Sequence, residues 1–334
     1  MRTVDTIIVG GGPAGSSCAW ALRRRGIDCL VLDRAAFPRL KLCAGWITPD
    51  AVRDLELDPA AYPHSFLTFD RLRFHLGPLN FTLRTTQHSI RRIELDAWLL
   101  RRSESEVVTH NVRSIREEGG QYVIDGAYRC RWLVGAGGTR CPVYRTFFRE
   151  RHPRDEGLQA AVLEEEFPFA WQDGTCHLWF FDNGLPGYSW YVPKAGGFLN
   201  VGIGGIATRL RAKRQDIKEQ FRHLEGVLSR SSLVHERTFD AAGYTYYLRA
   251  PKDPPRLGNT FVVGDAAGLA TRDMAEGIGP AVRSGLRAAD AIAAGVPYQL
   301  DDVPRYSLPA IAAEHPALRL FRRSAPPLGR ATAS

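Results

Sequence analysis

Apolar residues in this 334-residue chain gather into short runs separated by polar or glycine-containing segments. The β-branched run at 7–9 predicts a buried parallel strand, and residues 28–32 predict a second one. The segment between them, from about 14 to 25, is expected to be a helix. Residues 132–134 and 261–263 predict two more buried strands. Strands of this kind joined by helices indicate an α/β fold, or α+β when the whole chain is counted.

Other segments have β character without helices between them. Residues 69–75 and 80–84 are predicted strands joined by a Gly-Pro turn, and 112–115 is predicted to pair with 122–124 around a Gly-Gly turn. From 159 to 204 one strand follows another, which predicts a sheet that forms the far wall of a cavity. The aromatic residues expected on that wall are Trp179, Phe180, Phe181, Tyr188, Trp190, Tyr191 and Phe198.

Alternation along this aromatic strand predicts which side chains share a face. Tyr188, Trp190 and Val192 are expected on one face, and the residues between them on the other. Both an ordinary sheet core and a substrate-facing stripe fit this pattern.

A glycine-rich phosphate signature follows the first predicted strand. Gly10, Gly12 and Gly15 form a G-x-G-x-x-G pattern. The first glycine permits a tight turn, the second lets the backbone approach a pyrophosphate, and the third allows close packing of helix on strand. The helix that begins near Pro13 and Ala14 directs its first amides at the phosphates. A glycine-rich loop without a ligand is the alternative interpretation.

An acidic residue completes this signature. Asp33 follows the second predicted strand, 18 residues after Gly15, where it can accept hydrogen bonds from an adenosine ribose. By itself the signature fits NAD as well as FAD.

A second pattern lies near the other end of the chain. Gly264 and Asp265 follow the strand at 261–263, at the strand end where ligands of open α/β sheets bind. A carboxylate there can accept hydrogen bonds from a ribityl chain. Gly277 and Ile278 then open a helix to about residue 294, whose first amides are expected to face the pyrimidine edge of a flavin. The two patterns together predict one FAD.

These residues resemble the geranylgeranyl reductase family of flavoproteins, within the group that shares the para-hydroxybenzoate hydroxylase fold. The resemblance extends to about residue 295 and rests on four segments: Lys41-Leu42-Cys43-Ala44-Gly45, Arg92-Ile93-Glu94-Leu95-Asp96, 188–194 and 264–285.

The resemblance implies a discontinuous Rossmann-type FAD-binding domain from residues 1–45, 90–150 and 255–296. An inserted antiparallel β-sheet domain for the substrate is expected from 46–89 and 151–254, followed by a C-terminal helix and a disordered tail at 297–334. The implied FAD contacts are Gly10, Gly12, Pro13, Ala14, Gly15, Asp33, Arg34, Cys43, Ala44, Arg92, Gly137, Gly264, Asp265, Gly277 and Ile278. Cys43, Tyr188 and Trp190 are the implied catalytic positions beside the substrate, and for Cys43 both redox or acid chemistry and simple packing against the ring stay open.

The chain departs from the family pattern in three places. Gly137 stands where an aspartate is expected, which argues against direct reduction by NAD(P)H. Arg272 replaces a proline, and Ala275 replaces a glycine. Only about 40 residues follow the last flavin helix, so a C-terminal domain covering the substrate is expected to be reduced or absent.

Composition excludes several classes of protein. Hydrophobic content of 44% and charged content of 24% are ordinary for a globular protein. No apolar run approaches the roughly 20 residues that span a bilayer, and the N-terminus does not resemble a signal peptide, so a cytoplasmic location is expected. The six cysteines show no C-x-x-C spacing and the nine histidines no ligand pattern, so neither a metal site nor a disulfide framework is expected.

The net charge of +8 raises the question of anionic partners. One basic cluster is expected to open a helix, and a second lies near the C-terminus; solvated helix faces and attraction to an anionic membrane or a diphosphate substrate both fit them. No nucleic-acid-binding module is visible. The clusters are Arg209, Arg211, Lys213 and Arg214, then Arg319, Arg322, Arg323 and Arg330.

The leading functional hypothesis is an FAD-dependent oxidoreductase that reduces C=C bonds of an apolar isoprenoid with hydride from flavin N5. A flavin-dependent monooxygenase and a non-catalytic flavin- or lipid-binding protein are the two alternatives. The expected electron donor is NAD(P)H or a ferredoxin-type carrier, and an acidic donor protein would suit the basic surface.

Overall fold

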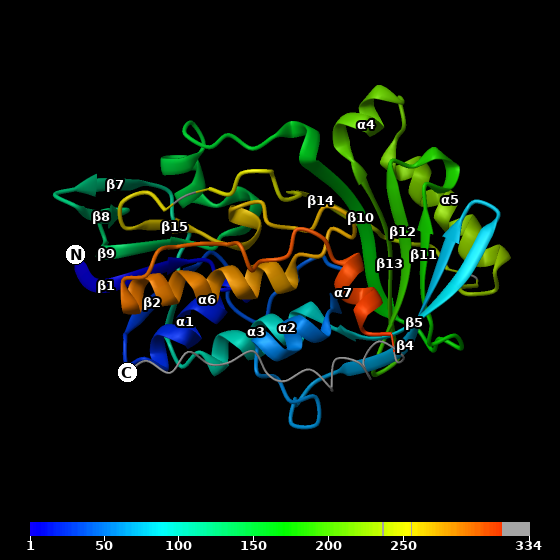
Figure 1. The fold of residues 1–334 in the computed structure, drawn as a ribbon, viewed down its shortest axis with the longest axis horizontal. Coiled ribbons are helices and arrows are strands. Elements are labelled where there is room, and N and C mark those ends of the chain that lie inside the picture. Colours follow the sequence, from blue (N-terminus) through cyan, green and yellow to red (C-terminus); the bar gives the residue numbers. More distant parts are fainter. Residues whose placement is uncertain (236, 255, 316–334) are drawn as a thin grey trace.

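The computed structural model describes residues 1–315 except 236 and 255, and these form two lobes (Figure 1). The first lobe contains both glycine signatures and combines a sheet with helices. The second lobe is a large sheet with two helices on its outer side.

A seven-stranded sheet forms the centre of the first lobe, in the order β6-β2-β1-β9-β8-β7, with β15 also paired to β9. The strands β6, β2, β1, β9 and β15 run parallel, while β8 and β7 form an antiparallel extension. The elements are β1 (Arg2–Val9), α1 (Pro13–Arg23), β2 (Cys29–Asp33), α3 (Arg92–Arg102), β6 (Glu106–Thr109), β7 (Ile115–Glu118), β8 (Gln121–Ile124), β9 (Tyr128–Gly135), β15 (Thr260–Val262) and α6 (Ile278–Ala294).

Buried β-branched and aliphatic side chains place β1 and β2 at the centre of this sheet. Ile7 pairs with Leu30, and both side chains are fully buried. Helices α1 and α6 pack so closely that a Cβ on Gly285 would lie 2.2 Å from the carbonyl oxygen of Ala14. The predicted strands, helices and parallel pairing are therefore confirmed, with small differences at the ends: Asp33 is the last residue of β2 rather than the residue after it. The exception is the strand predicted at 112–115, which lies instead at β7 (Ile115–Glu118).

The second lobe contains an eight-stranded sheet in the order β14-β10-β13-β12-β11-β4-β5-β3. Two separate chain segments build it, and where they meet, β11 and β4 pair in parallel, whereas every other pair is antiparallel. The elements are β3 (Trp46–Ile47), β4 (Phe66–Leu76), β5 (Leu79–Ile90), β10 (Gln159–Pro168), β11 (Cys176–Phe180), β12 (Gly187–Lys194), β13 (Phe198–Ile206), α4 (Ala207–Ala212), α5 (Ile217–Arg230) and β14 (Ala242–Tyr247). Helix α2 (Pro49–Asp54) lies between β3 and β4 in the sequence and packs on α6 of the first lobe.

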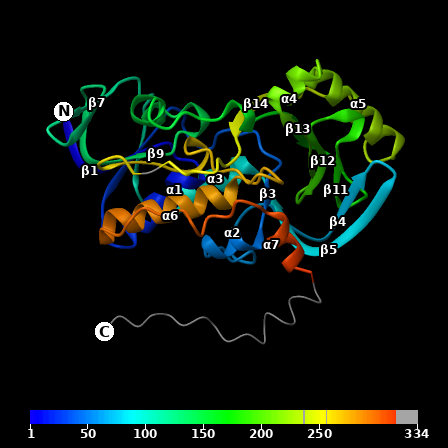
Figure 2. The same ribbon diagram turned by 45° about the horizontal axis from the view of Figure 1, so that its top comes forward.

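The two faces of this sheet have different neighbours. Helices α4 and α5 cover the outer face, away from α1 and α6 (Figure 2), where Tyr191 packs with Phe221. The inner face, which includes Trp190 and Val192, packs against Met274 of the first lobe. The predicted alternation is confirmed.

The predicted aromatic wall is wrong in part. Trp179 and Tyr191 lie in the core between the sheet and helices α4 and α5, on the face away from the cavity. Phe181 is 61% exposed at a turn. The period-2 alternation of a strand sends neighbouring aromatic residues to opposite faces, so the full set could not share one wall.

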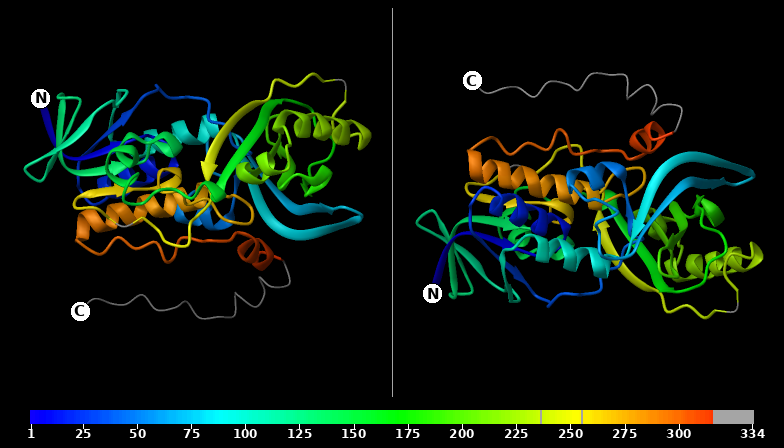
Figure 3. Two further views of the ribbon diagram at one scale, coloured as in Figure 1. Left: turned by 90° about the horizontal axis from the view of Figure 1, so that it is seen from above. Right: turned by 90° about the horizontal axis from the view of Figure 1, so that it is seen from below.

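Long hairpins and short helices complete the fold. The β4–β5 hairpin extends away from the first lobe when the molecule is seen from above and from below (Figure 3). Helix α7 (Leu308–Ala313) packs on β5, where the Thr85 hydroxyl donates to the carbonyl oxygen of Ile311 at 2.7 Å. Short helical turns are η1 (Gly138–Arg140), η2 (Tyr144–Phe148), η3 (Glu156–Leu158), η4 (Asp182–Gly184) and η5 (Gly264–Ala266).

The basic clusters differ from the prediction. Arg209 and Arg211 lie in α4, but Lys213 and Arg214 follow it, before α5 begins. The second cluster, at 319–330, lies outside the described residues. Within residues 1–315 apart from 236 and 255, no helix is both long and apolar enough to cross a membrane.

Candidate active site

The first glycine signature forms a cradle at the end of β1. A Cβ on Gly15 would lie 1.9 Å from the carbonyl oxygen of Gly10, so the helix starts in direct contact with the turn. A Cβ on Gly12 would instead meet only the Arg39 guanidinium, at 3.4 Å. No side chain caps the N-terminus of α1, which has Pro13 in its first turn. These free amides beside open space suit an anionic diphosphate.

Asp33 fixes the shape of this cradle. Its buried carboxylate accepts hydrogen bonds from the amides of Gly11 at 2.7 Å and Ala35 at 3.0 Å. Its place at the end of β2 keeps the predicted ribose contact within the same site. Arg34, the next predicted contact, is exposed.

Arg39 is a residue that the sequence interpretation missed. Its guanidinium lies 3.4 Å from the Asp96 carboxylate and 4.0 Å from that of Asp33. Asp96 is fully buried and also accepts both ends of the Arg92 guanidinium, at 2.8 and 2.9 Å. Two arginines therefore share one buried acid beside Gly12, and they place positive charge where the pyrophosphate of a dinucleotide would lie.

The second glycine signature lies against the first. A Cβ on Gly264 would lie 3.1 Å from the Cβ of Ala14, and the Gly264 amide donates to Ser284 of α6 at 2.9 Å. The Asp265 carboxylate has no hydrogen bond or ion pair among the described residues, which leaves its oxygens able to bind ribityl hydroxyls. Segments about 250 residues apart in sequence thus form one continuous site.

The start of α6 adds further groups to this site. Gly277 caps the helix without a side-chain hydrogen bond, and Ile278 is its first residue. The Glu276 carboxylate accepts the Gly279 amide at 2.6 Å, and burial raises the pKa of Glu276 to about 7. Free amides at this helix start can stabilise negative charge on a bound flavin ring.

Gly137 follows the C-terminal end of β9. It precedes η1, and a Cβ there would lie 3.2 Å from the Cα of Cys141. Arg154, which the sequence interpretation also missed, ties this turn to η5 by donating to the carbonyl oxygens of Thr139 at 2.6 Å and Ala266 at 2.8 Å. Arg154 therefore holds the Asp265 segment in place.

A cavity of about 240 Å³ lies between the two lobes. The predicted residues Cys43 and Arg92 line it from the first lobe, and Glu164 and Asn200 line it from the sheet. The Asn200 amide lies 3.5 Å from the Cys43 carbonyl oxygen, and the Cys43 sulfur is 3.4 Å from the Gly45 amide. The loop around Cys43 thus forms part of the cavity wall, and its predicted place beside the flavin stays a prediction.

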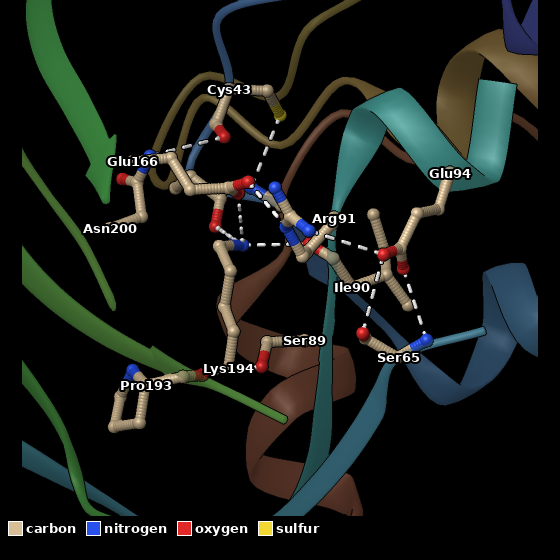
Figure 4. Close-up of polar contacts among 12 residues, drawn as sticks. Cys43, Ser65, Ser89, Ile90, Arg91, Glu94, Glu166, Pro193, Lys194 and Asn200 are labelled. Atoms are coloured by element: carbon tan, nitrogen blue, oxygen red, sulfur yellow. Dashed lines mark hydrogen bonds and ion pairs between the residues drawn. The ribbon is translucent and has the colours of Figure 1, made fainter. Parts of the chain in front are cut away.

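A buried lysine joins this loop to the sheet (Figure 4). The Lys194 ammonium, at the end of β12, donates to the carbonyl oxygens of Ala44 and Ile90, both at 2.7 Å. It also lies 3.5 Å from the Glu166 carboxylate, which accepts Arg91 at 2.8 Å. Burial lowers the pKa of Lys194. Ala44, a predicted FAD contact, is therefore held through its backbone by the second lobe.

An aromatic column runs across the inner face of the sheet toward this cavity. Successive ring centroids are 5.0 Å apart for Phe81 and Phe74, 5.9 Å for Phe74 and Phe180, and 5.1 Å for Phe180 and Tyr188. Trp190 follows at 5.7 Å from Tyr188. The column begins at Phe81, which is 48% exposed, and ends beside the cavity.

The polar atoms of the last two rings are already bonded. The Tyr188 hydroxyl donates to the Met274 carbonyl oxygen at 2.6 Å, and the Trp190 ring N–H donates to Asn200 at 2.7 Å. Burial raises the pKa of Tyr188. Neither side chain lines the cavity, although Trp190 is bonded to Asn200, which does. Their predicted place beside a substrate remains a prediction.

The residues present fit FAD. The cradle at Gly12 has room for a diphosphate, two arginines and a helix start supply positive charge, and the unpartnered Asp265 carboxylate follows Gly264, which packs against the first turn of α1.

Comparisons with known proteins support this assignment. Residues 8–54 match the family model of the NAD(P)-binding Rossmann-like domain. The chain is 30% identical over 238 residues to the menaquinone reductase of Mycobacterium tuberculosis, which covers 63% of this chain and 57% of that protein. It is 26% identical over 305 residues to the geranylgeranyl diphosphate reductase of Rhodobacter capsulatus, covering 86% of this chain and 74% of the other.

The fold has similar solved structures. A geranylgeranyl bacteriochlorophyll reductase-like protein from Thermoplasma acidophilum superposes with a TM-score of 0.74 at 18% identity, covering 97% of this chain and 87% of that one. The flavin-dependent brominase Bmp2 gives 0.68 at 19% identity, covering 89% and 81%.

Fold and relatives together define the class, an FAD-dependent oxidoreductase with the para-hydroxybenzoate hydroxylase-like fold. Within that class the chain is a relative of the geranylgeranyl reductases, as its motifs indicated.

Proposed function

We propose that this protein uses FAD to reduce isolated C=C bonds in an isoprenoid chain. The observation that carries the proposal is the aromatic column from Phe81 to Trp190, whose last ring donates its N–H to Asn200 in the lining of the cavity at Cys43. A long apolar chain can lie along such a surface with each segment removed from water. Relatives named for geranylgeranyl diphosphate and for menaquinone point to substrates with prenyl chains.

Each part of the site has a role in this proposal. Reduced flavin supplies the hydride when it is bound. Gly12, Arg39 and Asp265 bind and orient the cofactor, and the Cys43 loop holds one edge of the cavity. Tyr188 and Trp190 position the chain and exclude water from the reacting carbons, because their polar atoms are bonded away from it.

A single-turnover experiment tests this function. The FAD-loaded protein is reduced with dithionite without oxygen and mixed with geranylgeranyl diphosphate or with a menaquinone. We expect reoxidation of the flavin by at least one of these, together with a product that gains two hydrogens per reduced bond. No reoxidation by either compound, and instead a hydroxylated product after oxygen is added, would establish the monooxygenase alternative. Absence of any turnover would support the alternative of a non-catalytic flavin- or lipid-binding protein.

The electron donor is a separate part of the proposal. Because Gly137 replaces the expected aspartate, we propose a ferredoxin-type carrier rather than NAD(P)H, docked by exposed arginines such as Arg209 and Arg211. Anaerobic reduction of the flavin should be faster with reduced ferredoxin than with NADPH, and should slow with added salt. Fast reduction by NADPH would contradict this choice.

A further inference from the structure

Glu164 is a buried carboxyl in the cavity wall that no motif identified. It lies on β10 with its side chain toward the inner face and is 1% exposed. The neighbouring strand has a glycine at this point, because a Cβ on Gly202 would lie 2.6 Å from the Cβ of Glu164 and 2.3 Å from the Trp190 ring. The sheet is thus hollowed so that Trp190 and Glu164 lie together beside the cavity.

The Glu164 carboxyl lacks a full set of partners. Its Oε2 has no hydrogen bond although it is buried. The nearby cations are engaged with other groups: Lys194 donates to two carbonyl oxygens, and the Lys41 ammonium lies 4.0 Å from the centre of the Tyr244 ring. An ionised carboxylate in this position is costly, so the neutral acid is favoured.

Several ionisable groups face Glu164 and affect its charge. Burial raises the pKa of Glu164 to about 7, whereas Lys194, Lys41 and the Cys43 backbone act in the opposite direction. The groups that face it from the surrounding elements are Lys41, Cys43, Arg92, Glu166, Tyr188, Lys194, Tyr244 and Tyr246.

We propose that Glu164 is the acid that protonates the substrate carbon during C=C reduction, an inference that rests on the function proposed above. The geometry points to it because Glu164 lines the cavity beside Cys43 and one of its carboxylate oxygens has no hydrogen-bond partner. One carbon of the double bond receives the hydride that reduced flavin supplies, and the other receives the proton of Glu164. The π electron pair becomes the second C–H bond, the flavin is oxidised by two electrons, and the Glu164 carboxylate regains a proton from water.

Other candidate acids in the cavity are less suitable. The Tyr188 hydroxyl is donated to the Met274 carbonyl oxygen, so its proton points away from the cavity. Glu166 is ion-paired with Arg91 and Lys194. Glu164 combines a carboxyl that burial keeps protonated up to about neutral pH with a place in the cavity lining.

The test compares Glu164→Gln with Glu165→Gln, which removes the adjacent carboxyl of β10. Glu165 is a matched control because its carboxylate is ion-paired with Arg237 and accepts the Asp240 amide at 2.7 Å. Both variants are loaded with FAD, reduced with dithionite and mixed with geranylgeranyl diphosphate. For E164Q we expect normal flavin binding and reduction, but reoxidation slowed roughly 100-fold or more, since acid catalysis contributes about 10²–10⁴.

The pH profile and an infrared measurement give independent readouts. The wild-type and E165Q rates should fall as pH rises through about 7, and E164Q should lose this dependence. Infrared difference spectra of the substrate-free protein should show carboxyl bands that titrate near neutral pH, of which one disappears in E164Q and another in Glu276→Gln. Glu164→Asp, which keeps an acid, should recover part of the rate.

The outcomes separate the two proposals. If wild-type protein reduces the substrate and E164Q does so at the same rate with the same pH profile, or if no carboxyl band disappears in E164Q, the role of Glu164 is wrong while the function stands. If wild-type protein reduces neither geranylgeranyl diphosphate nor menaquinone, the proposed function fails and the role of Glu164 fails with it.

Discussion

Gly45→Ala is the sharpest test of how the two lobes are joined. Gly45 has a φ of +67°, and a Cβ there would lie 2.1 Å from the Ile90 carbonyl oxygen and 2.2 Å from the Lys194 ammonium. Backbone on one side and a fully buried cation on the other leave the new methyl group no space. The substitution must therefore displace the ammonium from at least one carbonyl oxygen.

The cost can be worked out from these contacts. A residue other than glycine in the left-handed region costs about 1–2 kcal/mol, and loss of a hydrogen bond to a charged group costs about 1.5–3 kcal/mol. We expect G45A to lower the free energy of unfolding by roughly 3–5 kcal/mol. Gly77→Ala is the control, because Gly77 has a φ of +58° and no atom within 4 Å of its would-be Cβ. It should lose only about 1 kcal/mol.

Urea unfolding followed by tryptophan fluorescence gives both values, and a flavin titration gives a second readout. G45A should also bind FAD more weakly than G77A, because Ala44 and Cys43 move with the loop. Equal unfolding midpoints for G45A and G77A would refute the assigned role of Lys194 as the link between the lobes.

Four further substitutions test the site. Gly12→Val should leave the fold intact but abolish the flavin absorbance of the purified protein. Gly15→Val should prevent folding, because a Cβ on Gly15 would overlap the Gly10 carbonyl oxygen. Circular dichroism measures folding and absorbance measures bound flavin, so together they separate the two results. Asp265→Ala should lower flavin affinity about tenfold or more with little change in unfolding, since the carboxylate has no partner among the described residues, and unchanged affinity would contradict a ribityl contact. Glu164→Gln should remove the cost of ionising a buried carboxyl. Because the folded-state pKa is raised from 4.5 to about 7, the wild-type free energy of unfolding is fully present below pH 4.5 and falls by roughly 3 kcal/mol as pH rises to 7. Urea midpoints of variant and wild type should therefore diverge over that range, and a constant difference between them would refute this reasoning.

Much of the cofactor half could be predicted from the sequence because its chemistry is local. The glycines of each signature act within a few residues of a strand end, so spacing alone identifies them. The residues at the start of α6 were predicted for the same reason. The faces that the side chains of β12 occupy could also be predicted, because side chains alternate between the two faces of a strand.

The missed residues depend on contacts between distant segments. Lys194 reaches Ala44 across 150 positions, and Arg39 acts through Asp96 on another element. One local signal was available for Glu164: it continues the inward-facing positions of Ala160 and Val162 along a buried strand. A single acidic residue among buried apolar positions indicates either that its carboxylate is ion-paired or that it has a functional role, and the sequence does not distinguish the two.

The Lys194 link also limits how a long molecule can reach the flavin. Swinging the sheet away from the Ala44 loop would break the hydrogen bonds of the Lys194 ammonium to Ala44 and Ile90, and a hydrogen bond to a charged group contributes about 1.5–3 kcal/mol. Under the proposed function, an elongated substrate would then enter lengthwise, without separation of the two lobes. The bonds nearest the leading end would meet the reactive ring first, and the order in which an elongated molecule becomes saturated would follow from its direction of entry.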